Sequence, residues 1–303
     1  MIDEYGGPEQ LRLGEHRDPK VAPGEVLVRV KAAGVNPVDW KVGAGHLDGI
    51  MEVRYPLIPG WDVSGVVEAV GLDVSEFAVG DEVMGYIRKD TVELGAYAEF
   101  VAAHVRLLAH KPAALDWAQA AGLPLAGLTA YQSIRRVHVD RGDTVLVHAA
   151  AGGVGSLGTQ LAVAAGARVI GTAGEHNHDF LRELGATPVN YGQGLASRVR
   201  EIASDGVDAA LDFVGGDAVE NSRELVQDPT RIASITDTAA ADSGGQYVWV
   251  RPNTDELAHL ARLADESKLT VPVAQTRPLS EAAEAWRQSQ SGRTRGKLVL
   301  TVA

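Results

Sequence analysis

The sequence predicts an α/β protein in which a doubly wound parallel sheet is inserted into a β domain, either barrel-like or a sandwich. Three features predict it: a glycine-rich turn joining an apolar strand to a helix, alternating strands and helices around that turn, and a β-rich segment before them. A closing strand at the end of the chain completes the pattern, because it provides a return to the first domain.

Short strands separated by frequent prolines and glycines are expected over roughly the first 110 residues. Residues 26–32 alternate between apolar and polar side chains with a period of two, which is typical of a half-buried strand. The other strands expected here are residues 65–71, 82–87 and 97–102.

The composition changes near Asp116, a good helix N-cap, which precedes an Ala- and Leu-rich helical pattern over residues 117–137, interrupted at Pro124. Strands and helices then alternate, which predicts a parallel sheet. The expected strands are 144–148, 168–172, 209–214 and 231–235, and the expected helices are 154–165, 178–184 and 218–226.

The tail is expected to form a helix over residues 254–266, a second helix over 280–290 with Ser280 as its N-cap, and a strand over 296–302. We therefore expect residues 1–115 and 251–303 to form one domain and residues 116–250 to form the inserted nucleotide-binding domain.

Composition excludes several function classes. The formal net charge of −12 argues against nucleic acid and anionic membrane surfaces as partners, because both need clustered positive charge. The chain has no cysteine, so disulfides, thiolate nucleophiles and cysteine-ligated zinc are excluded. No apolar run is long enough to span a membrane and no signal-peptide pattern is present, which predicts a cytoplasmic protein.

The central motif is the turn at residues 149–155, with the sequence AAAGGVG. An apolar strand precedes it, a helical pattern follows it, and a second strand arrives about 20 residues later, as in a dinucleotide-binding βαβ unit. Backbone N–H groups at a helix start attract phosphate. We expect Gly152, Gly153 and Val154 to bind the pyrophosphate of a dinucleotide; a tight turn without a ligand is the alternative.

Six motifs in the same order resemble the zinc-free, quinone oxidoreductase-like branch of the medium-chain dehydrogenase/reductase superfamily. They are residues 33–41 (AGVNPVDWK), 59–65 (PGWDVSG), 79–83 (VGDEV), 127–131 (GLTAY), 149–155 (AAAGGVG) and 293–299 (RTRGKLV).

This resemblance implies a GroES-like β-barrel domain with an inserted Rossmann domain, and a homodimer formed through the sheet edge near residues 247–250. Zinc-dependent relatives carry a Cys at the position of Asn36 and a His at that of Trp61, so the resemblance implies a reaction without metal. The family usually places a short strand before the segment that resembles residues 3–8.

NADPH is the cofactor expected from the second strand. That strand ends at Thr172 and leads to Gly174 with no acidic residue at its tip, whereas an acid there would bind the ribose 2′-hydroxyl of NAD. The resemblance places Gly174 and Tyr191 beside the 2′-phosphate. His178 is a candidate phosphate partner or an inert surface residue, and Glu175 weakens the preference because it lies one residue past the tip.

The nicotinamide half is expected at the carboxyl ends of the next two strands, where ligands of parallel sheets bind. Val214 and Gly215 are the first candidates there, and Ser234 and Ile235 are weaker ones. The resemblance adds Thr129 near the nicotinamide ribose, or as a packing residue, and Lys297 close to the cofactor, or as an ordinary strand-edge lysine.

Lys41 and Asn36 are the candidate catalytic residues, both in a loop that the family places beside the nicotinamide. The ammonium group of Lys41 can donate a hydrogen bond or a proton to a substrate carbonyl as hydride arrives; an exposed, solvated lysine is the alternative. Asn36 is expected to orient the loop or the cofactor rather than to react.

The resulting functional expectation is an NADPH-dependent reductase of a quinone or an α,β-unsaturated carbonyl. Two alternatives stay open at the sequence level. One is a non-catalytic NADPH-binding protein, such as a sensor or a crystallin-like protein. The other is an enoyl reductase of a biosynthetic pathway, for which the net charge of −12 is unfavourable if the acyl carrier is acidic.

Overall fold

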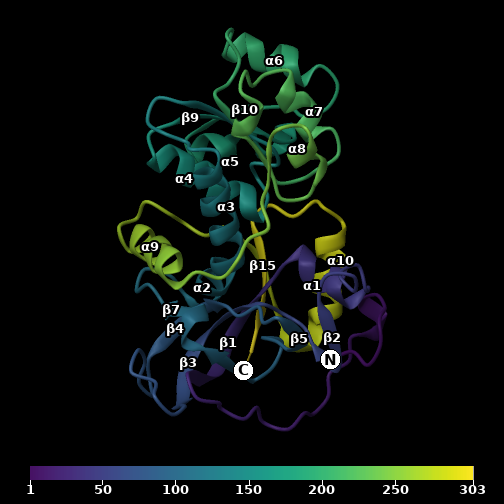
Figure 1. Cartoon of the computed structure of the whole chain (residues 1–303), viewed down its shortest axis with the longest axis vertical. Helices are drawn as coiled ribbons and strands as arrows, with labels where there is room; N and C mark the ends of the chain where they lie inside the picture. Colours follow the sequence, from purple (N-terminus) through teal and green to yellow (C-terminus); the bar gives the residue numbers. More distant parts are fainter. Residues whose placement is uncertain (303) are drawn as a thin grey trace. The chain divides into compact units, whose positions relative to one another are not determined.

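A computed structural model describes residues 1–302 and divides the chain into two compact units. The first unit contains residues 1–125, 252–267 and those from 271 onward, and the second contains residues 126–251 and 268–270. The second unit is therefore inserted into the first (Figure 1).

The main sheet of the first unit has the strand order β14-β15-β1-β3-β4-β7, and β6 also pairs with β1. Strands β2 and β5 form a separate pair. The strands are β1 (Glu25–Val35), β2 (Glu52–Ile58), β3 (Asp62–Val70), β4 (Glu82–Tyr86), β5 (Thr91–Leu94), β6 (Phe100–His104), β7 (Leu108–His110), β14 (Val273–Pro278) and β15 (Lys297–Thr301).

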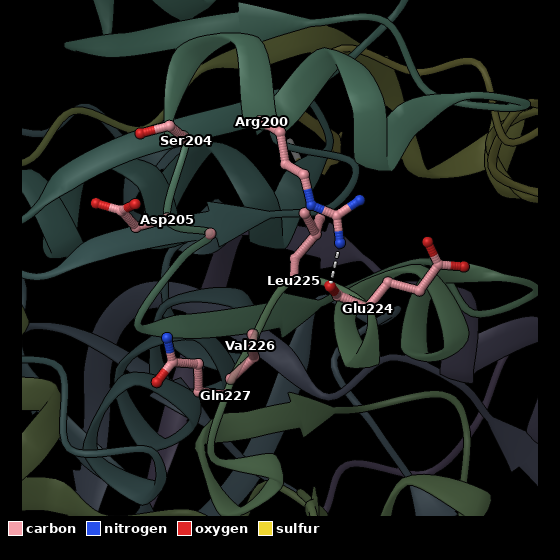
Figure 2. Close-up of a pocket in the computed structure, with 8 residues that line it drawn as sticks. Arg200, Ser204, Asp205, Glu224, Leu225, Val226 and Gln227 are labelled. Carbon is pink, nitrogen blue, oxygen red and sulfur yellow. Dashed lines mark hydrogen bonds between the residues drawn. The ribbon is translucent and has the colours of Figure 1, made fainter.

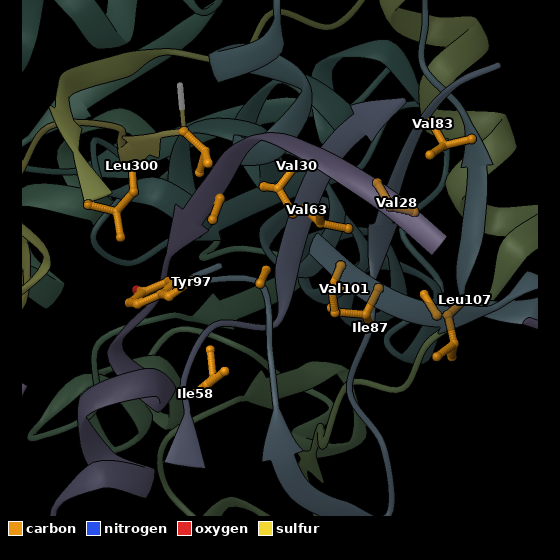
Figure 3. Packing of buried hydrophobic residues seen from close by; sticks show 14 of the residues in the cluster. Val28, Val30, Ile58, Val63, Val83, Ile87, Tyr97, Val101, Leu107 and Leu300 are labelled. Carbon is orange, nitrogen blue, oxygen red and sulfur yellow. The ribbon is translucent and has the colours of Figure 1, made fainter. Parts of the chain in front are cut away.

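Alternation along β1 explains how this sheet encloses a core. Val26, Val28 and Val30 are buried, whereas Arg29 points to the other face and pairs with Glu68 at 3.0 Å. Figure 3 shows the apolar side chains that meet inside the sheet. They include Val63, Val83, Val101, Leu107 and Leu300.

The helices of the first unit cover this sheet. Helix α9 contacts β7, and α10 contacts β15 and β1. The helices are α1 (Pro37–Gly43), α2 (Trp117–Gly122), α9 (Thr254–Asp265) and α10 (Ala282–Gln290), with short 3-10 turns at Pro8–Gln10, Val105–Leu107 and Leu279–Glu281.

The sheet of the second unit is parallel, with the strand order β10-β9-β8-β11-β12-β13. This order is that of a dinucleotide-binding doubly wound fold, in which β8 is the first strand. The strands are β8 (Thr144–Val147), β9 (Arg168–Thr172), β10 (Ala186–Val189), β11 (Ala209–Asp212), β12 (Ile232–Ser234) and β13 (Gln246–Tyr247).

Most connections between these strands are helical, as parallel pairing requires. Strand β11 is buried along its whole length, which fits a strand covered on both faces. The helices are α3 (Pro124–Arg136), α4 (Gly153–Ala164), α5 (His178–Glu183), α6 (Leu195–Ile202), α7 (Ala218–Arg223) and α8 (Ala239–Asp242), with 3-10 turns at Glu175–Asn177 and Pro229–Arg231.

The division between the units comes at Leu125, ten residues after the boundary expected from composition. Helix α2 belongs to the first unit because it contacts β1, β3 and β15. The Ser64 hydroxyl donates to the carbonyl of Trp117 at 2.7 Å, and the N–H of Leu125 donates to Asp62 at 2.8 Å.

The two ends of the second unit are joined by a pair of hydrogen bonds. The amide of Gln132, in α3, donates to the carbonyl of Arg251 at 2.8 Å and accepts its N–H at 3.2 Å. The exit at Arg251 is therefore tied to α3, the helix by which the chain enters this unit.

Three local expectations are corrected by the structure. Asn36 is the N-cap of α1 and residues 37–41 lie in that helix rather than in a loop, because the Asn36 and Asp39 side chains make a capping box. Glu281, not Ser280, is the N-cap of α10, since a 3-10 turn precedes that helix. Strand β6 begins at Phe100 rather than at residue 97.

No helix within residues 1–302 is both long and apolar enough to cross a lipid bilayer.

Candidate functional site

The glycine turn after β8 has the tight geometry that a phosphate cradle needs. Ala149 adopts a left-handed conformation with φ of 51°, which is uncommon for a residue with a Cβ. Its N–H donates to the Thr172 hydroxyl at 3.0 Å, which ties the turn to the end of β9. A Cβ on Gly155 would lie 2.1 Å from the Ala149 carbonyl oxygen, so only glycine fits there.

Helix α4 presents an uncapped N-terminus beside this turn. Gly152 is its N-cap and provides no side-chain hydrogen bond. Gly152, Gly153 and Val154 are partly accessible, whereas Gly155 is buried. The N–H of Gly152 donates to the Ala149 carbonyl at 2.9 Å, so Gly152 leaves room in front of the helix rather than offering a donor. The unpaired N–H groups of a first helical turn bind anions, so the turn that begins with Gly153 and Val154 fits the pyrophosphate of a dinucleotide.

The corner expected to recognise the adenosine ribose lies after β9. Gly174 is partly accessible, and a Cβ there would lie 2.9 Å from the His176 ring and 4.0 Å from Tyr191 Cε1. Tyr191 is 68% exposed, so its ring remains available to a ligand. Thr172 is buried and supports the turn through the Ala149 bond.

The His178 side chain does not present its Nε2 atom at the surface, as a residue that binds phosphate would. Its Nε2 atom is buried and has no hydrogen-bond partner within the described chain. Glu175 and His176 are exposed on the same 3-10 turn. The assignment of His178 to the cofactor therefore stays a prediction, and its Nε2 is unsuited to contact a ligand in this conformation.

Arg198 supplies the positive charge at this corner that the sequence pattern left unidentified. From α6, its guanidinium donates hydrogen bonds of 2.8–3.3 Å to four successive carbonyls, those of residues 190–193. Because the loop it holds includes Tyr191, Arg198 fixes that residue's backbone. Its place eight residues after Asn190 gave no motif by which to find it.

The carboxyl ends of β11 and β12 bring together the residues expected near the nicotinamide. Val214 is 58% exposed, and Gly215 follows with φ of 83°. Strand β11 stops at Asp212, two residues before the expected end, because its carboxylate accepts the N–H groups of Val214 and Gly215 at 2.8 Å. Ser234 is buried and donates to Asp212 at 2.6 Å.

Three further residues of the second unit make contacts of their own. Thr129 is buried in α3, where its carbonyl accepts the Ser133 hydroxyl at 2.7 Å. The N–H of Ile235 donates to the Asp212 carbonyl at 3.2 Å. His148 follows β8, and its Nε2 lies 2.8 Å from the Ser222 hydroxyl, while burial lowers the pKa of His148 to about 4.

Asn36 is held in the first unit by a buried polar network. Its Oδ1 accepts Lys297 Nζ at 2.5 Å, and its Nδ2 donates to Asp62 Oδ2 at 2.9 Å. Asn36 is only 2% exposed. Both ends of its amide are therefore engaged inside the protein, which fits an orienting role rather than a reacting one.

Lys297 is also internal. Besides Asn36, its Nζ contacts the carbonyl of Val35 at 3.4 Å and lies 3.8 Å from Asp62. Burial lowers the pKa of Lys297, and the Asp62 carboxylate opposes that shift. Within this network Lys297 orders the start of α1, and its expected contact with the cofactor remains a prediction.

Asp39 is the least satisfied carboxylate of this network. Its Oδ2 accepts the N–H of Asn36 at 2.8 Å and the Tyr97 hydroxyl at 2.9 Å, whereas its Oδ1 is buried without a hydrogen-bond partner among the described residues. Burial raises the pKa of Asp39 to about 7. The capping box that begins α1 thus contains a carboxyl that titrates near neutrality.

Lys41 lies in the last turn of α1 and is partly accessible. Its Nζ lies 5.6 Å from the centre of the Trp40 ring, a cation–π distance that keeps the ammonium away from the internal network. The Trp40 indole in turn donates to Ser289 of α10 at 3.3 Å. Lys41 therefore places an ammonium group at the end of a helix that is joined to α10 through the Trp40 side chain.

The residues of the first unit do not fit a zinc site. Asn36 uses its amide within the network, Trp61 has no metal-binding atom, and the sequence has no cysteine. Within residues 1–302 no three His, Cys, Asp or Glu side chains are grouped as metal ligands. No step of the chemistry is therefore assigned to a metal.

A polar pocket of the second unit lies away from these residues (Figure 2). It includes Ser204, Asp205 and Gly206, which precede β11, whereas ligands of parallel sheets bind beyond the carboxyl ends. Arg200 is already bonded there to the carbonyl of Glu224 at 2.6 Å. This pocket is at the wrong end of β11 for the cofactor.

Comparison with known families agrees with this geometry. Residues 22–113 match the model of the alcohol dehydrogenase GroES-like domain, and residues 184–300 match the model described as zinc-binding dehydrogenase. The second description concerns the family at large, since this chain has no cysteine and its described residues include no group of three His, Cys, Asp or Glu side chains that could hold a metal ion.

Full-length relatives are similar over both units. The chain is 32% identical to an NADPH-dependent alkenal/one oxidoreductase of Arabidopsis thaliana, over 99% of this chain and 78% of that protein. It is 31% identical to the mitochondrial reticulon-4-interacting protein 1 of Caenorhabditis elegans, over 92% of this chain and 88% of that protein.

Solved structures extend the similarity to the fold. The quinone oxidoreductase from Coxiella burnetii matches with a TM-score of 0.87 and 34% identity, over 100% of this chain and 98% of that one. A mycobacterial protein solved in complex with NADPH matches with a TM-score of 0.83 and 31% identity, over 99% and 98% of the two chains. The chain therefore belongs to the quinone oxidoreductase-like branch of the medium-chain dehydrogenase/reductase family, which are oxidoreductases with a nicotinamide cofactor.

Proposed function

We propose that the protein is an NADPH-dependent reductase of a quinone or an α,β-unsaturated carbonyl. The observation that carries the proposal is the glycine cradle at the start of α4, within a chain similar throughout its length to quinone and alkenal/one oxidoreductases. Bound NADPH would supply the hydride. The tasks left to the protein are to hold the cofactor, orient the substrate and stabilise charge on its oxygen.

NADPH is preferred over NADH for two reasons. The strand β9 leads through Ala173 to Gly174 without an acid that would bind a ribose 2′-hydroxyl. The loop next to it carries the exposed Tyr191 on a backbone fixed by the Arg198 guanidinium. A fixed positive charge near a 2′-phosphate favours binding of the phosphorylated cofactor.

Lys41 is the proposed catalytic residue. Its ammonium donates a hydrogen bond to the carbonyl oxygen of the substrate and stabilises the negative charge that develops there as hydride is added to carbon. The proton needed to complete the reduction comes from Lys41 or from water. Asn36, with both amide ends bonded internally, maintains the helix that carries Lys41.

Lys41→Ala tests this assignment. We expect the turnover number for enones to fall by about 10²-fold, since a positioned acid contributes on the order of 10²–10⁴, while the dissociation constant of NADPH stays within twofold. NADPH oxidation at 340 nm with panels of quinones and enones gives the rates, and cofactor fluorescence gives the affinity. The matched control is Lys20→Ala, which removes an exposed lysine elsewhere in the first unit.

The outcomes separate the possibilities. If the wild type binds NADPH and oxidises it with none of the substrates, a non-catalytic NADPH-binding protein is supported and the reductase proposal fails. If Lys41→Ala reduces enones as fast as the wild type, the protein is a reductase in which Lys41 has no catalytic role.

The homodimer and the cytoplasmic location also stay proposals. Strand β13 is an edge of the parallel sheet in the described chain, and an edge strand can pair with a second copy. Several relatives are named as chloroplastic or mitochondrial proteins, so location differs within the family. Sedimentation of the purified protein tests the dimer.

A further inference from the structure

A single buried carboxylate closes two turns at the carboxyl edge of the parallel sheet. Oδ1 of Asp212 accepts the N–H groups of Val214 and Gly215, both at 2.8 Å. Oδ2 accepts the hydroxyl groups of Ser234 at 2.6 Å and of Thr236 at 3.3 Å. Both oxygens of this fully buried side chain are thus used, one for the turn after β11 and one for the turn after β12.

Ser234 extends this arrangement along the second turn. While its hydroxyl hydrogen goes to Asp212, its oxygen accepts the N–H groups of Asp237 at 2.9 Å and Thr236 at 3.2 Å. The two turns are also in close contact, because a Cβ on Gly215 would lie 2.9 Å from the Thr236 hydroxyl oxygen. Residues 213–216 and 235–237, named here the Asp212-linked turns, are therefore held together.

The position of the Asp212-linked turns in the sheet indicates a role in ligand binding. Strand β11 lies directly beside β8, and the chain passes from β8 to β9 on one side before it returns to β11 on the other. Such a reversal of strand order is the place where doubly wound sheets bind their ligands, beyond the carboxyl ends. The glycine turn follows β8, and the Asp212-linked turns follow β11 and β12.

Building on the proposed function, we infer that Asp212 and Ser234 are positioning residues for the nicotinamide half of the cofactor. They are buried and act through the backbone of Val214 and Gly215, of which Val214 is 58% exposed. An untethered turn of two consecutive glycines (215 and 216, both with positive φ) would sample many conformations. A fixed turn matters because a misplacement of about 1 Å costs on the order of 10²-fold in rate.

Comparison of a whole cofactor with half of one tests this role. Adenosine 2′,5′-bisphosphate carries the 2′-phosphate and lacks the nicotinamide. For Asp212→Asn and Ser234→Ala we expect NADPH to bind about tenfold more weakly, equivalent to the loss of one buried hydrogen bond. The turnover number should fall with it, while the bisphosphate binds within twofold of its wild-type affinity.

Two further variants serve as controls. Asp217→Asn removes an exposed carboxylate of the same segment that makes no capping bond, and it should leave NADPH binding unchanged. Ser234→Thr keeps the hydroxyl group, and it should restore most of the affinity lost in Ser234→Ala. Circular dichroism and the melting temperature of each variant show that the sheet is intact.

Equal weakening of NADPH and the bisphosphate would overturn the inference, because it would show a general structural role in the second unit. Unchanged NADPH binding in both Asp212→Asn and Ser234→Ala would overturn it as well. If the wild-type protein binds neither ligand, the proposed function itself fails, and this result is distinguishable because it appears before any substitution.

Discussion

At the scale of single residues, three buried aspartates show how differently one side chain is accommodated. Asp62 lies near the ammonium group of Lys297 and accepts two N–H groups. Asp212 uses both oxygens to accept hydrogen bonds from two turns. Asp39 has a buried oxygen without a partner in the described chain, so it bears the desolvation cost that the others offset.

The pH dependence of stability follows from Asp39. Its pKa is raised to about 7, above about 3.9 for an unfolded aspartate, so the folded state binds more protons between these values. The stabilisation from protonated Asp39 is complete below pH ~4 and is lost as the pH rises through ~7, by up to about 1.4 kcal/mol per pH unit. His148, with its pKa lowered to about 4, has the opposite effect below pH ~6.5.

Asp39→Asn should remove the contribution of Asp39 to the pH dependence of the free energy of unfolding. We expect the free energy of unfolding of the variant, relative to the wild type, to increase between pH 5 and about 7 and to level off above pH ~7, as measured by urea denaturation. A constant offset from the new amide does not affect this slope. Asp48→Asn is the matched control, because Asp48 also accepts a tyrosine hydroxyl but is exposed. A difference that does not vary with pH would contradict the role of Asp39.

At the scale of elements, the start of α4 does two things through two glycines. Gly155 permits the turn itself, since a Cβ there would lie 2.1 Å from the Ala149 carbonyl oxygen. Gly152 leaves space in front of the helix, and a Cβ there would lie 3.3 Å from the same oxygen, a contact that a small shift relieves. Gly155 is therefore needed for the turn to fold, and Gly152 is the glycine whose proposed task is to leave room for the ligand.

Two alanine substitutions should separate these roles. Gly155→Ala should lower the melting temperature and reduce NADPH affinity, because the turn has to open. Gly152→Ala should leave the melting temperature nearly unchanged and reduce NADPH affinity by about tenfold or more, since it fills the cradle. Gly49→Ala, at an open position, is the neutral control. Equal melting temperatures for the two cradle variants would contradict this division.

At the scale of the whole molecule, the residues proposed to bind the nucleotide belong to the second unit, apart from Lys297, which lies with Lys41 in the first. A ligand that binds only folded protein stabilises it by about 2.7 kcal/mol at a hundred times its dissociation constant. Three parts of the proposed site lie in the second unit: the glycine turn before α4, the loop that carries Tyr191, and the Asp212-linked turns. Stabilisation by the cofactor should therefore be largest in the unfolding of that unit.

Differential scanning calorimetry tests this expectation. NADPH should raise the melting temperature more than NADH at the same concentration, because only NADPH carries the 2′-phosphate. Arg198→Met should reduce this difference, while Arg200→Met on the same helix should preserve it, since Arg200 bonds to Glu224 instead. Equal shifts for the two cofactors in the wild type would contradict the preference for NADPH.

The sequence was sufficient to predict what depends on neighbouring residues. The strand–turn–helix at residues 144–164 and the alternation after it follow from local periodicity and agree with the structure. The short helix α1 was expected as a loop, because only its capping box, Asn36 with Asp39, signals a helix in seven residues.

The buried networks could not be predicted in the same way. The partner of Asn36 is 261 residues away in Lys297, and that of Asp212 is 22 residues away in Ser234. Such pairs depend on strand order and register, which the pattern of one segment does not contain. Lys297 was therefore recognised as part of a motif and Asp212 lay within an expected strand, while their contacts became visible only in three dimensions.

The two hydrogen bonds between Gln132 and Arg251 have an evolutionary consequence. They tie the exit of residues 126–251 to the helix by which the chain enters, so the host unit accommodates this segment as it would accommodate a surface loop. A segment with adjoining ends can be exchanged as a cassette, with little change in the path of the flanking chain. If the proposed site residues are right, cofactor preference is inherited mainly through the cassette and substrate chemistry through its host.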